Sequence, residues 1–313
     1  MNNSQIVAKD PQDEKILYPE FNKLKERNRE LQTLLSIGGW NFGTSRFTTM
    51  LSTFANREKF INSVISFLRR QDFDGLDLFF LYPGLRGSPM RDRWTFVFLI
   101  EELLLAFQKE AQLTMRPRLL LTAAVSGVPH IIQTSYDVRL LGRFLDFINV
   151  LSYDFHGSWE KFTGHNSPLF SLPEDPKSSA YTMNYWRKLG VPSEKLIMGL
   201  PTYGRTFHLL TASKNGLQAR AMGPASPGKY TQQPGFLAYY EVILEQFQDV
   251  FYYRFAPLSR ERRSTGLNIS MSHMPTRGRS GLAMMMPSAS VTRVQLNSFT
   301  TILALTCCEF FKN

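Results

Sequence analysis

Five short apolar runs, rich in β-branched and aromatic residues, recur along the chain and predict five β-strands. They are Leu31–Ile37, Gly75–Leu81, Leu119–Val125, Phe147–Leu151 and Leu196–Leu200. Amphipathic helical patterns lie before and between them, at Tyr18–Glu30, Arg57–Arg70, Trp94–Ala111, Ser135–Phe144 and Ser179–Leu189. Near-continuous apolar strands that alternate with helices favour an α/β fold with a parallel sheet covered on both faces.

Each predicted strand ends in a polar or glycine-rich cluster. These clusters are Gly38–Asn41, Tyr82–Gly84, Ser126–Gly127, Tyr153–Asp154 and Tyr203–Arg205. Functional groups at the carboxyl ends of parallel strands are typical of a (β/α)₈ barrel or a related open α/β sheet. A closed barrel needs eight strands, so five predicted strands indicate an incomplete one.

The run from Phe73 to Gly84 is a candidate catalytic segment, because acidic residues occur in its first half and are absent from the rest. Side chains alternate between the two faces of a strand, so Asp77, Phe79 and Leu81 share one face. An enzyme that cleaves a polar polymer needs carboxylates along such a face. Here the face holds one acid followed by two apolar groups.

This run resembles the catalytic strand of the family-18 glycoside hydrolases, the chitinases, whose pattern is Asp-Gly-x-Asp-x-Asp-x-Glu followed by Tyr-Pro-Gly. The pattern matches at Asp74, Asp77 and Tyr82–Gly84, and fails where Phe79 and Leu81 replace its last two acids. Further matching segments are Ser36–Gly43, Leu151–Trp159 and Gly199–Phe207. The resemblance extends from about residue 5 to Val242.

The resemblance implies an incomplete (β/α)₈ TIM barrel of the chitinase type over residues 1–207. Residues 208–242 resemble the beginning of the family's small α+β insertion domain. From residue 243 to 313 the composition changes to Ser, Thr, Arg and Met, and we expect a divergent tail without a fold of its own. Because the family places strands before and after the matching region, the chain is expected to be truncated at both ends.

The family mechanism implied by the resemblance is substrate-assisted: a Glu protonates the leaving oxygen while an Asp orients the sugar's N-acetyl group. Leu81 and Phe79 stand at those two positions and can do neither. General acid catalysis contributes about 10²–10⁴-fold to a rate. The sequence therefore predicts a catalytically inactive chitinase-like lectin. The alternatives are a weakly active chitinase and a truncated chain without a stable sugar site.

Sugar sites combine flat aromatic faces with a few fixed polar groups. Trp40 follows Gly38 and Gly39, which favours an exposed stacking platform over a core tryptophan. Asn41 could bind a sugar hydroxyl or simply serve the turn.

The resemblance implies that Tyr153 and Asp154 hold the N-acetyl group and that Tyr203 and Arg205 form a second polar pair. Tyr82, Leu151 and Ser152 lie in the same motifs and complete the expected ligand-binding set. Asp74 and Asp77 are interpreted as structural, since buried carboxylates need partners.

For partners and location, the resemblance implies a secreted protein that binds chitin-like or N-acetylglucosamine-containing glycans. The doubly apolar variant of the catalytic strand resembles secreted family members for which association with the egg coat and gametes is implied. The start of the chain shows no apolar signal-peptide region, and no run is long enough to span a membrane. Glycosylation sequons occur at Asn2 and Asn268.

The formal net charge of +10 could attract nucleic acid, sulfated or sialylated glycans, or membrane headgroups. The Lys and Arg residues are scattered and lie beside no nucleic-acid motif, which favours a solvated basic surface. Two adjacent cysteines, Cys307 and Cys308, exclude a disulfide framework. His130, His156 and His165 lack metal-ligand spacing, and no phosphate-binding loop is found, so neither metal nor cofactor is expected.

Overall fold

The computed structural model describes residues 4–172 and 174–242, together with the backbone of 267–270 and 282–285. The described chain forms two compact units. The first holds residues 4–150 and 183–198, and the second holds 151–182 and 199–242 with the two short segments that follow.

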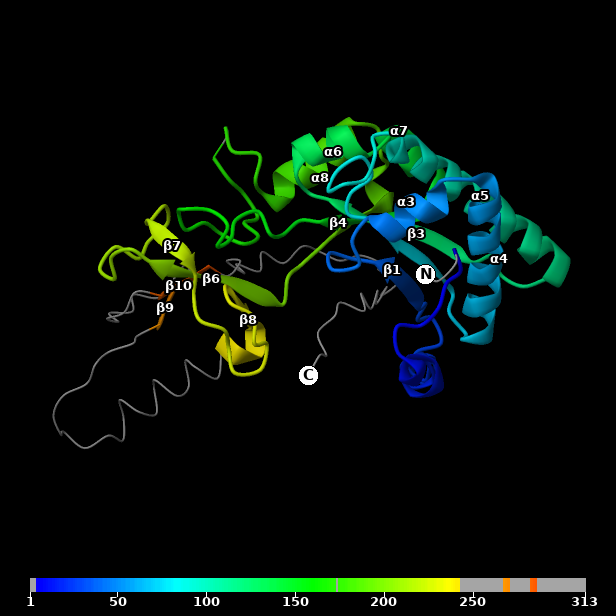
Figure 1. The fold of residues 1–313 in the computed structure, drawn as a ribbon, viewed down its shortest axis with the longest axis horizontal. Helices are drawn as coiled ribbons and strands as arrows, with labels where there is room; N and C mark the ends of the chain where they lie inside the picture. Colours follow the sequence, from blue (N-terminus) through cyan, green and yellow to red (C-terminus); the bar gives the residue numbers. More distant parts are fainter. Residues whose placement is uncertain (1–3, 173, 243–266, 271–281, 286–313) are drawn as a thin grey trace. The chain divides into compact units, whose positions relative to one another are not determined.

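The first unit is built on a five-stranded sheet that confirms the predicted parallel α/β fold (Figure 1). Its strands follow one another in the order β1 to β5. They are β1 (Leu34–Gly38), β2 (Gly75–Phe79), β3 (Leu120–Ser126), β4 (Phe147–Leu151) and β5 (Leu196–Met198). Each overlaps one of the five apolar runs. Every residue of β2 is buried, as expected for a strand covered on both faces.

Helices overlap each of the five stretches predicted from the 3.6-residue periodicity, with two differences in their bounds, and also form at 13–17, 45–51, 129–135 and 193–195, where none was predicted. They are η1 (Asp13–Leu17), α1 (Tyr18–Asn22), α2 (Leu24–Arg27), α3 (Ser45–Leu51), α4 (Phe54–Arg70), α5 (Asp92–Thr114), α6 (Pro129–Ser135), α7 (Val138–Phe144), α8 (Ser179–Lys188) and η2 (Ser193–Lys195). The helix predicted over 18–30 ends early, because Asn28 is extended. The one predicted over 135–144 is interrupted by extended Tyr136, after which the Asp137 carboxylate caps α7 by accepting from the Leu140 amide.

Helices α4 and α5 run beside the sheet (Figure 1). Two arginine–carboxylate pairs join them. Arg57 binds Glu102 through two hydrogen bonds of 2.8 Å. Arg69 pairs with Glu110 nearer the C-terminal ends of the two helices. Beneath them the core is aromatic. The Phe80 ring stacks on Phe47 at 4.4 Å between centroids. The bidentate hydrogen bonds between Arg57 and Glu102 fix the spacing of α4 and α5 as well as adding attraction.

Gly75 begins β2 at a point where two strands approach closely. A Cβ atom at this position would lie 2.4 Å from the Leu120 carbonyl oxygen of β3, closer than atoms can pack. The chain therefore needs glycine here to keep the β2–β3 register, in which Gly75 is opposite Leu120.

We expect Gly75→Ala to lower the free energy of unfolding by about 2 kcal/mol, because the added methyl group forces the strands apart. Chemical denaturation measures this change. Gly216→Ala is the matched control, since a Cβ there meets nothing within 4 Å. Equal stability of the two variants would contradict the close approach.

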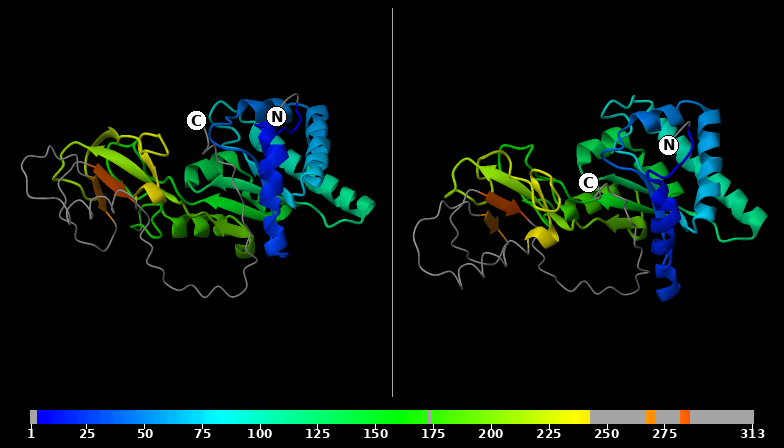
Figure 2. Two further views of the ribbon diagram at one scale, coloured as in Figure 1. Left: turned by 90° about the horizontal axis from the view of Figure 1, so that it is seen from below. Right: turned by 60° about the horizontal axis from the view of Figure 1, so that its bottom comes forward.

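The second unit contains an antiparallel sheet around β6 (Tyr203–Leu209). Its other strands are β7 (Ala221–Pro224), β8 (Phe236–Ala238), β9 (Leu267–Ser270) and β10 (Leu282–Met285). The order is β7–β6–β10–β9, β8 also pairs with β6, and β6, β7 and β10 lie side by side in Figures 1 and 2. Strand β6 spans the boundary expected between residues 207 and 208.

Two segments of the tail, which is expected to lack a fold, thus pair into this sheet. Strand β10 is antiparallel to β6 and parallel to β9. The rest of 243–313 lies outside the described residues. Both paired segments, Leu-Asn-Ile-Ser and Leu-Ala-Met-Met, are only four residues long, which is too short for a period that pattern analysis can detect.

Candidate functional site

One group of candidate site residues lies where β1 ends. Gly38 has a φ of +122°, and a Cβ atom there would lie 2.2 Å from the Phe79 carbonyl oxygen. The Gly39 amide donates to the same oxygen at 2.9 Å. This close crossing turns the chain away from the sheet and leaves Trp40 61% exposed, with Asn41 exposed beside it. Trp40 is therefore a surface platform, and the alternative of a core tryptophan is wrong.

The neighbouring strand end is apolar. Phe79 and Leu81 are only 7% and 4% exposed, and Tyr82 is half-buried. Neither Phe79 nor Leu81 can donate or accept a proton. At the positions where the chitinase pattern has acids, this chain has packed hydrocarbon.

Asp77 lies deeper on β2 and is 2% exposed. Its carboxylate accepts hydrogen bonds from Ser36 of β1 at 2.7 Å, Thr122 of β3 at 2.7 Å and Asn149 of β4 at 2.9 Å. One side chain thus connects four adjacent strands. Burial raises the pKa of Asp77, and the hydrogen bonds from Thr122, Ser36 and Asn149 oppose that rise.

Asp74 lies before β2, at the opposite end of that strand from Phe79. It accepts from the Thr33 amide at 2.7 Å and pairs with Lys25 at 2.9 Å. These contacts occupy the carboxylate within the fold. The interpretation of Asp74 and Asp77 as structural residues is supported by their partners.

A second group of candidate site residues is in the other unit and centres on Asp154 and Arg205. The Arg205 guanidinium donates through Nε to Asp154 Oδ1 at 2.8 Å, and a second nitrogen lies 2.7 Å from the same oxygen. Asp154 has a φ of +58°, and its amide donates to the Asn166 side chain at 3.0 Å. The turn after β4 is thereby fixed with its carboxylate towards β6.

Aromatic rings surround this ion pair. The Arg205 guanidinium carbon lies 5.1 Å from the Trp159 ring centroid, 5.4 Å from Tyr203 and 5.6 Å from Phe236. Tyr203 stacks on Phe236 at 4.6 Å. Tyr153 approaches the Tyr203 ring edge-on, with 6.2 Å between centroids. Burial and the nearby Asp154 carboxylate raise the pKa of Tyr203 well above its ordinary value, so its hydroxyl remains protonated at neutral pH.

The two remaining residues of the expected set differ in character. Leu151 ends β4 and is half-buried. Ser152 is fully buried, and its hydroxyl donates to the Gly199 carbonyl at 2.8 Å while its own carbonyl accepts from Ser167. Ser152 is therefore engaged within the fold, which favours a structural role over ligand contact.

Sequence reasoning did not select two residues that belong with this group. Trp159 is 58% exposed and stands within the matching segment Leu151–Trp159, so its motif could have revealed it. Phe236 lies in β8, which pairs with β6 through Arg205 opposite Phe236. Its distance along the chain concealed it.

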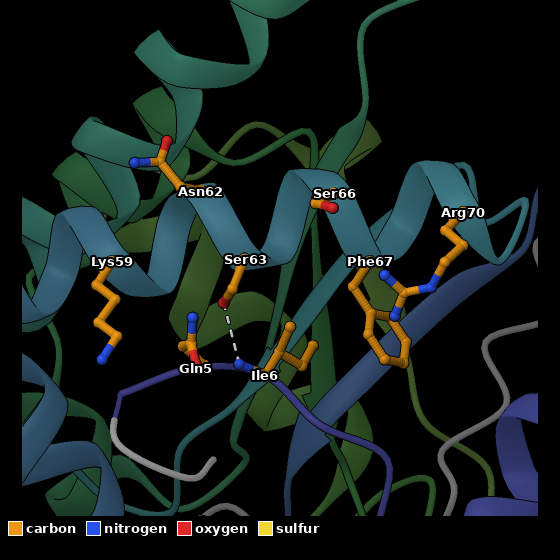
Figure 3. A pocket seen from close by; sticks show the side chains of 8 residues that line it. All are labelled: Gln5, Ile6, Lys59, Asn62, Ser63, Ser66, Phe67 and Arg70. Carbon is orange, nitrogen blue, oxygen red and sulfur yellow. Dashed lines mark hydrogen bonds between the residues drawn. The ribbon is translucent and has the colours of Figure 1, made fainter.

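A separate cavity of about 470 Å³ lies between residues 5–6 and one face of α4 (Figure 3). Its lining residues are Gln5, Ile6, Lys59, Asn62, Ser63, Ser66, Phe67 and Arg70. The Ile6 amide donates to the Ser63 hydroxyl at 3.0 Å across it. None of the candidate sugar-binding residues lines this cavity. Strand ends do not form it either.

Two further properties of the described part of the chain bear on the kinds of site it holds. Within it, no three His, Cys, Asp or Glu side chains are placed to hold a metal ion. Its helices include none with the length and apolarity needed to cross a membrane.

Residues 1–271 match the family described as "Glycosyl hydrolases family 18", and the chain belongs to this family. Its first sheet is accordingly part of a (β/α)₈ barrel of the chitinase type, of which five strands are described.

Among its relatives, human oviduct-specific glycoprotein is 88% identical over 242 residues, which are 77% of this chain and 36% of that protein. Mouse chitotriosidase-1 is 48% identical over 246 residues, covering 77% of this chain and 53% of the relative. The chain thus spans between about a third and a half of these proteins.

Solved structures give the same fold. A structure described as human YKL-39, "a pseudo-chitinase with retained chitooligosaccharide binding properties", is 44% identical with a TM-score of 0.73, covering 80% of this chain and 68% of that one. The active chitinase TsES1 from Trichuris suis is 40% identical with a TM-score of 0.75, covering 79% and 67%.

Proposed function

We propose that this chain is a catalytically inactive chitinase-like lectin that binds chitin oligomers or other N-acetylglucosamine-containing glycans. The observation that carries the proposal is the contrast at neighbouring strand ends. Trp40 is 61% exposed as a stacking platform, while Phe79 and Leu81 bury hydrocarbon at the positions of the family's acids. A sugar can be held by the first feature and cannot be cleaved through the second.

The second unit supports the same proposal. Asp154 and Arg205 supply fixed hydrogen-bonding groups, and the aromatic rings of Trp159 and Tyr203 lie beside them. Carbohydrate sites typically combine a small number of polar groups with aromatic faces. Retained chitooligosaccharide binding in a pseudo-chitinase of the same family is consistent with this role.

The likeness to oviduct-specific glycoproteins supports a biological setting. We infer a secreted protein of oviduct fluid that associates with egg-coat glycoproteins and acts around fertilization. Fluorescently labelled chain should stain isolated egg coats, and free N-acetylglucosamine oligomer should displace it. Staining that the oligomer leaves unchanged would contradict a glycan-mediated association.

Trp40→Ala tests the stacking platform. We expect its Kd for an N-acetylglucosamine oligomer to rise at least 10-fold, because aromatic residues at the centre of a site often carry about 2 kcal/mol or more. Titration calorimetry measures the change. Trp94→Ala is the matched control, since Trp94 on α5 is exposed to a similar extent, 50%, but belongs to no candidate site. Equal affinities of the two variants would remove Trp40 from the site.

A second candidate is a chain without a stable sugar site. In the described sheet, β1 and β5 each have a strand partner on one side only. Unpaired strand edges invite aggregation or pairing with another chain. Under this alternative the purified chain would be polydisperse and would melt without a cooperative transition.

A further inference from the structure

Arg86 lies against the exposed indole of Trp40. Its guanidinium carbon is 3.7 Å from the centre of the ring. One terminal nitrogen donates to the Trp40 carbonyl at 3.1 Å, and the other donates to the Leu81 carbonyl at 2.8 Å. An exposed arginine usually samples many rotamers. This one is held by three contacts at the rim of the proposed sugar platform.

The backbone that carries Arg86 is also fixed. Its φ is +54°, and its carbonyl accepts from the Thr44 hydroxyl at 3.0 Å. The loop is closed from within, because the Gly84 amide donates to Ser88 at 3.0 Å and the Ser88 hydroxyl donates to buried Asp92 at 2.7 Å. The guanidinium is thus positioned before any ligand arrives, which lowers the entropic cost of binding.

The contacts of Arg86 leave its charge available. Guanidinium carries five N–H donors, and the bonds to Trp40 and Leu81 use two of them. Within the described residues, Arg86 has no carboxylate at ion-pair distance. A planar fork with free donors matches the geometry of a carboxylate or sulfate.

The two chain segments that hold Trp40 and Arg86 carry mostly positive charge. The segments 39–46 and 84–93 together carry Arg46, Arg86, Arg91 and Arg93 but a single acid, Asp92. Asp92 is 2% exposed and accepts from Ser88 and Thr48, so it faces the interior. An anion that approaches this rim meets positive charge without a competing surface carboxylate from these segments.

We propose that Arg86 and Trp40 form a subsite for a sugar that carries an anionic group, either a carboxylate or a sulfate ester. Arg86 covers one face of the indole, so the pyranose ring stacks on the opposite face, and its acidic substituent extends past the ring edge to the free guanidinium donors. This inference rests on the proposed lectin function and names the glycan class that the site prefers. It also assigns a part of the chain's net positive charge to a specific place, the rim beside Trp40.

The test compares charged and neutral probes of equal length. One pair is an N-acetylglucosamine oligomer and its 6-O-sulfated form. The other is sialyl-N-acetyllactosamine and its asialo counterpart. We expect the chain to bind at least one charged probe roughly tenfold more tightly than its neutral partner, as charge-assisted hydrogen bonds allow. The two pairs distinguish sulfate from carboxylate recognition.

Variants assign the preference to Arg86. The charged-to-neutral affinity ratio should fall close to one in Arg86→Gln and to an intermediate value in Arg86→Lys, which keeps the charge but loses the planar fork. Arg116→Gln removes one exposed charge near the end of α5 and should keep the ratio. Using the ratio cancels any shared change in the Trp40 platform.

Each outcome decides the inference. A ratio near one for both pairs in the unmodified chain would overturn it, and so would a preference that persists in Arg86→Gln. Binding of charged probes with no binding of neutral ones would support the anionic subsite and would exclude neutral chitin oligomers as ligands. Failure to bind any probe would overturn both.

Discussion

The purified chain should release no fluorophore from a chitobioside substrate above a heat-killed control. Leu81 stands where the family pattern has its proton donor, and Phe79 stands where it has the acid that orients the N-acetyl group. Loss of general acid catalysis alone costs about 10²–10⁴-fold in rate. Loss of the second acid adds to this cost. A fluorescence assay over several hours measures the expected absence of turnover.

A matched pair of double variants extends this prediction. Phe79→Asp with Leu81→Glu should hydrolyse the substrate about 100-fold faster or more than Phe79→Asp with Leu81→Gln, because only glutamate can transfer a proton. Both positions are less than 8% exposed, and burial favours the protonated carboxyl that a general acid needs. Turnover well above the control in the unmodified chain would contradict inactivity.

Asp77→Ala should lower the free energy of unfolding by about 3 kcal/mol, the second large effect that we expect. Truncation removes the acceptor for Ser36, Thr122 and Asn149 and leaves buried donors without partners. Asp77→Asn keeps the shape and the hydrogen bonds, since its amide can donate to the Ser36 hydroxyl. The asparagine variant should therefore remain within about 1 kcal/mol of the unmodified chain.

The pH dependence of the free energy of unfolding is a second test of the role of Asp77. The pKa of Asp77 is higher in the folded chain than its ordinary value of 3.8, because burial disfavours the charged form. The folded state then binds the proton more tightly, so the free energy of unfolding falls as pH rises from 3.8 through the folded pKa. Asp77→Asn should remove this fall. An unchanged pH profile in Asp77→Asn would contradict the assignment to Asp77.

The parallel sheet was predictable because its central strands, β2 and β3, are buried on both faces. A strand of that kind is a continuous apolar run, as Gly75–Phe79 shows, and it is visible without any tertiary information. The helix predicted from Ser135 begins only at Val138, and periodicity alone did not indicate this later start. The capping residue Asp137 is the signal that marks the new helix start.

The candidate site was predictable only in part, for a related reason. Trp40 and Asp154 lie in short motifs that follow strands, as predicted, and local sequence is enough to find them. Arg205 was selected from its motif too, but it lies inside β6 and not at the strand end where it was expected. Phe236 joins the second group only through antiparallel pairing of β8 with β6. Contacts of this kind depend on register between distant segments, which local patterns do not contain.

The central claim is that this chain folds and binds N-acetylglucosamine oligomers. A thermal melt with and without millimolar oligomer tests it most directly. We predict a cooperative transition that moves to higher temperature with ligand, since a ligand at 100 times its Kd stabilises the folded state by about 2.7 kcal/mol. A cooperative transition that the oligomer leaves unmoved would contradict the sugar site, and the absence of any cooperative transition would contradict the fold.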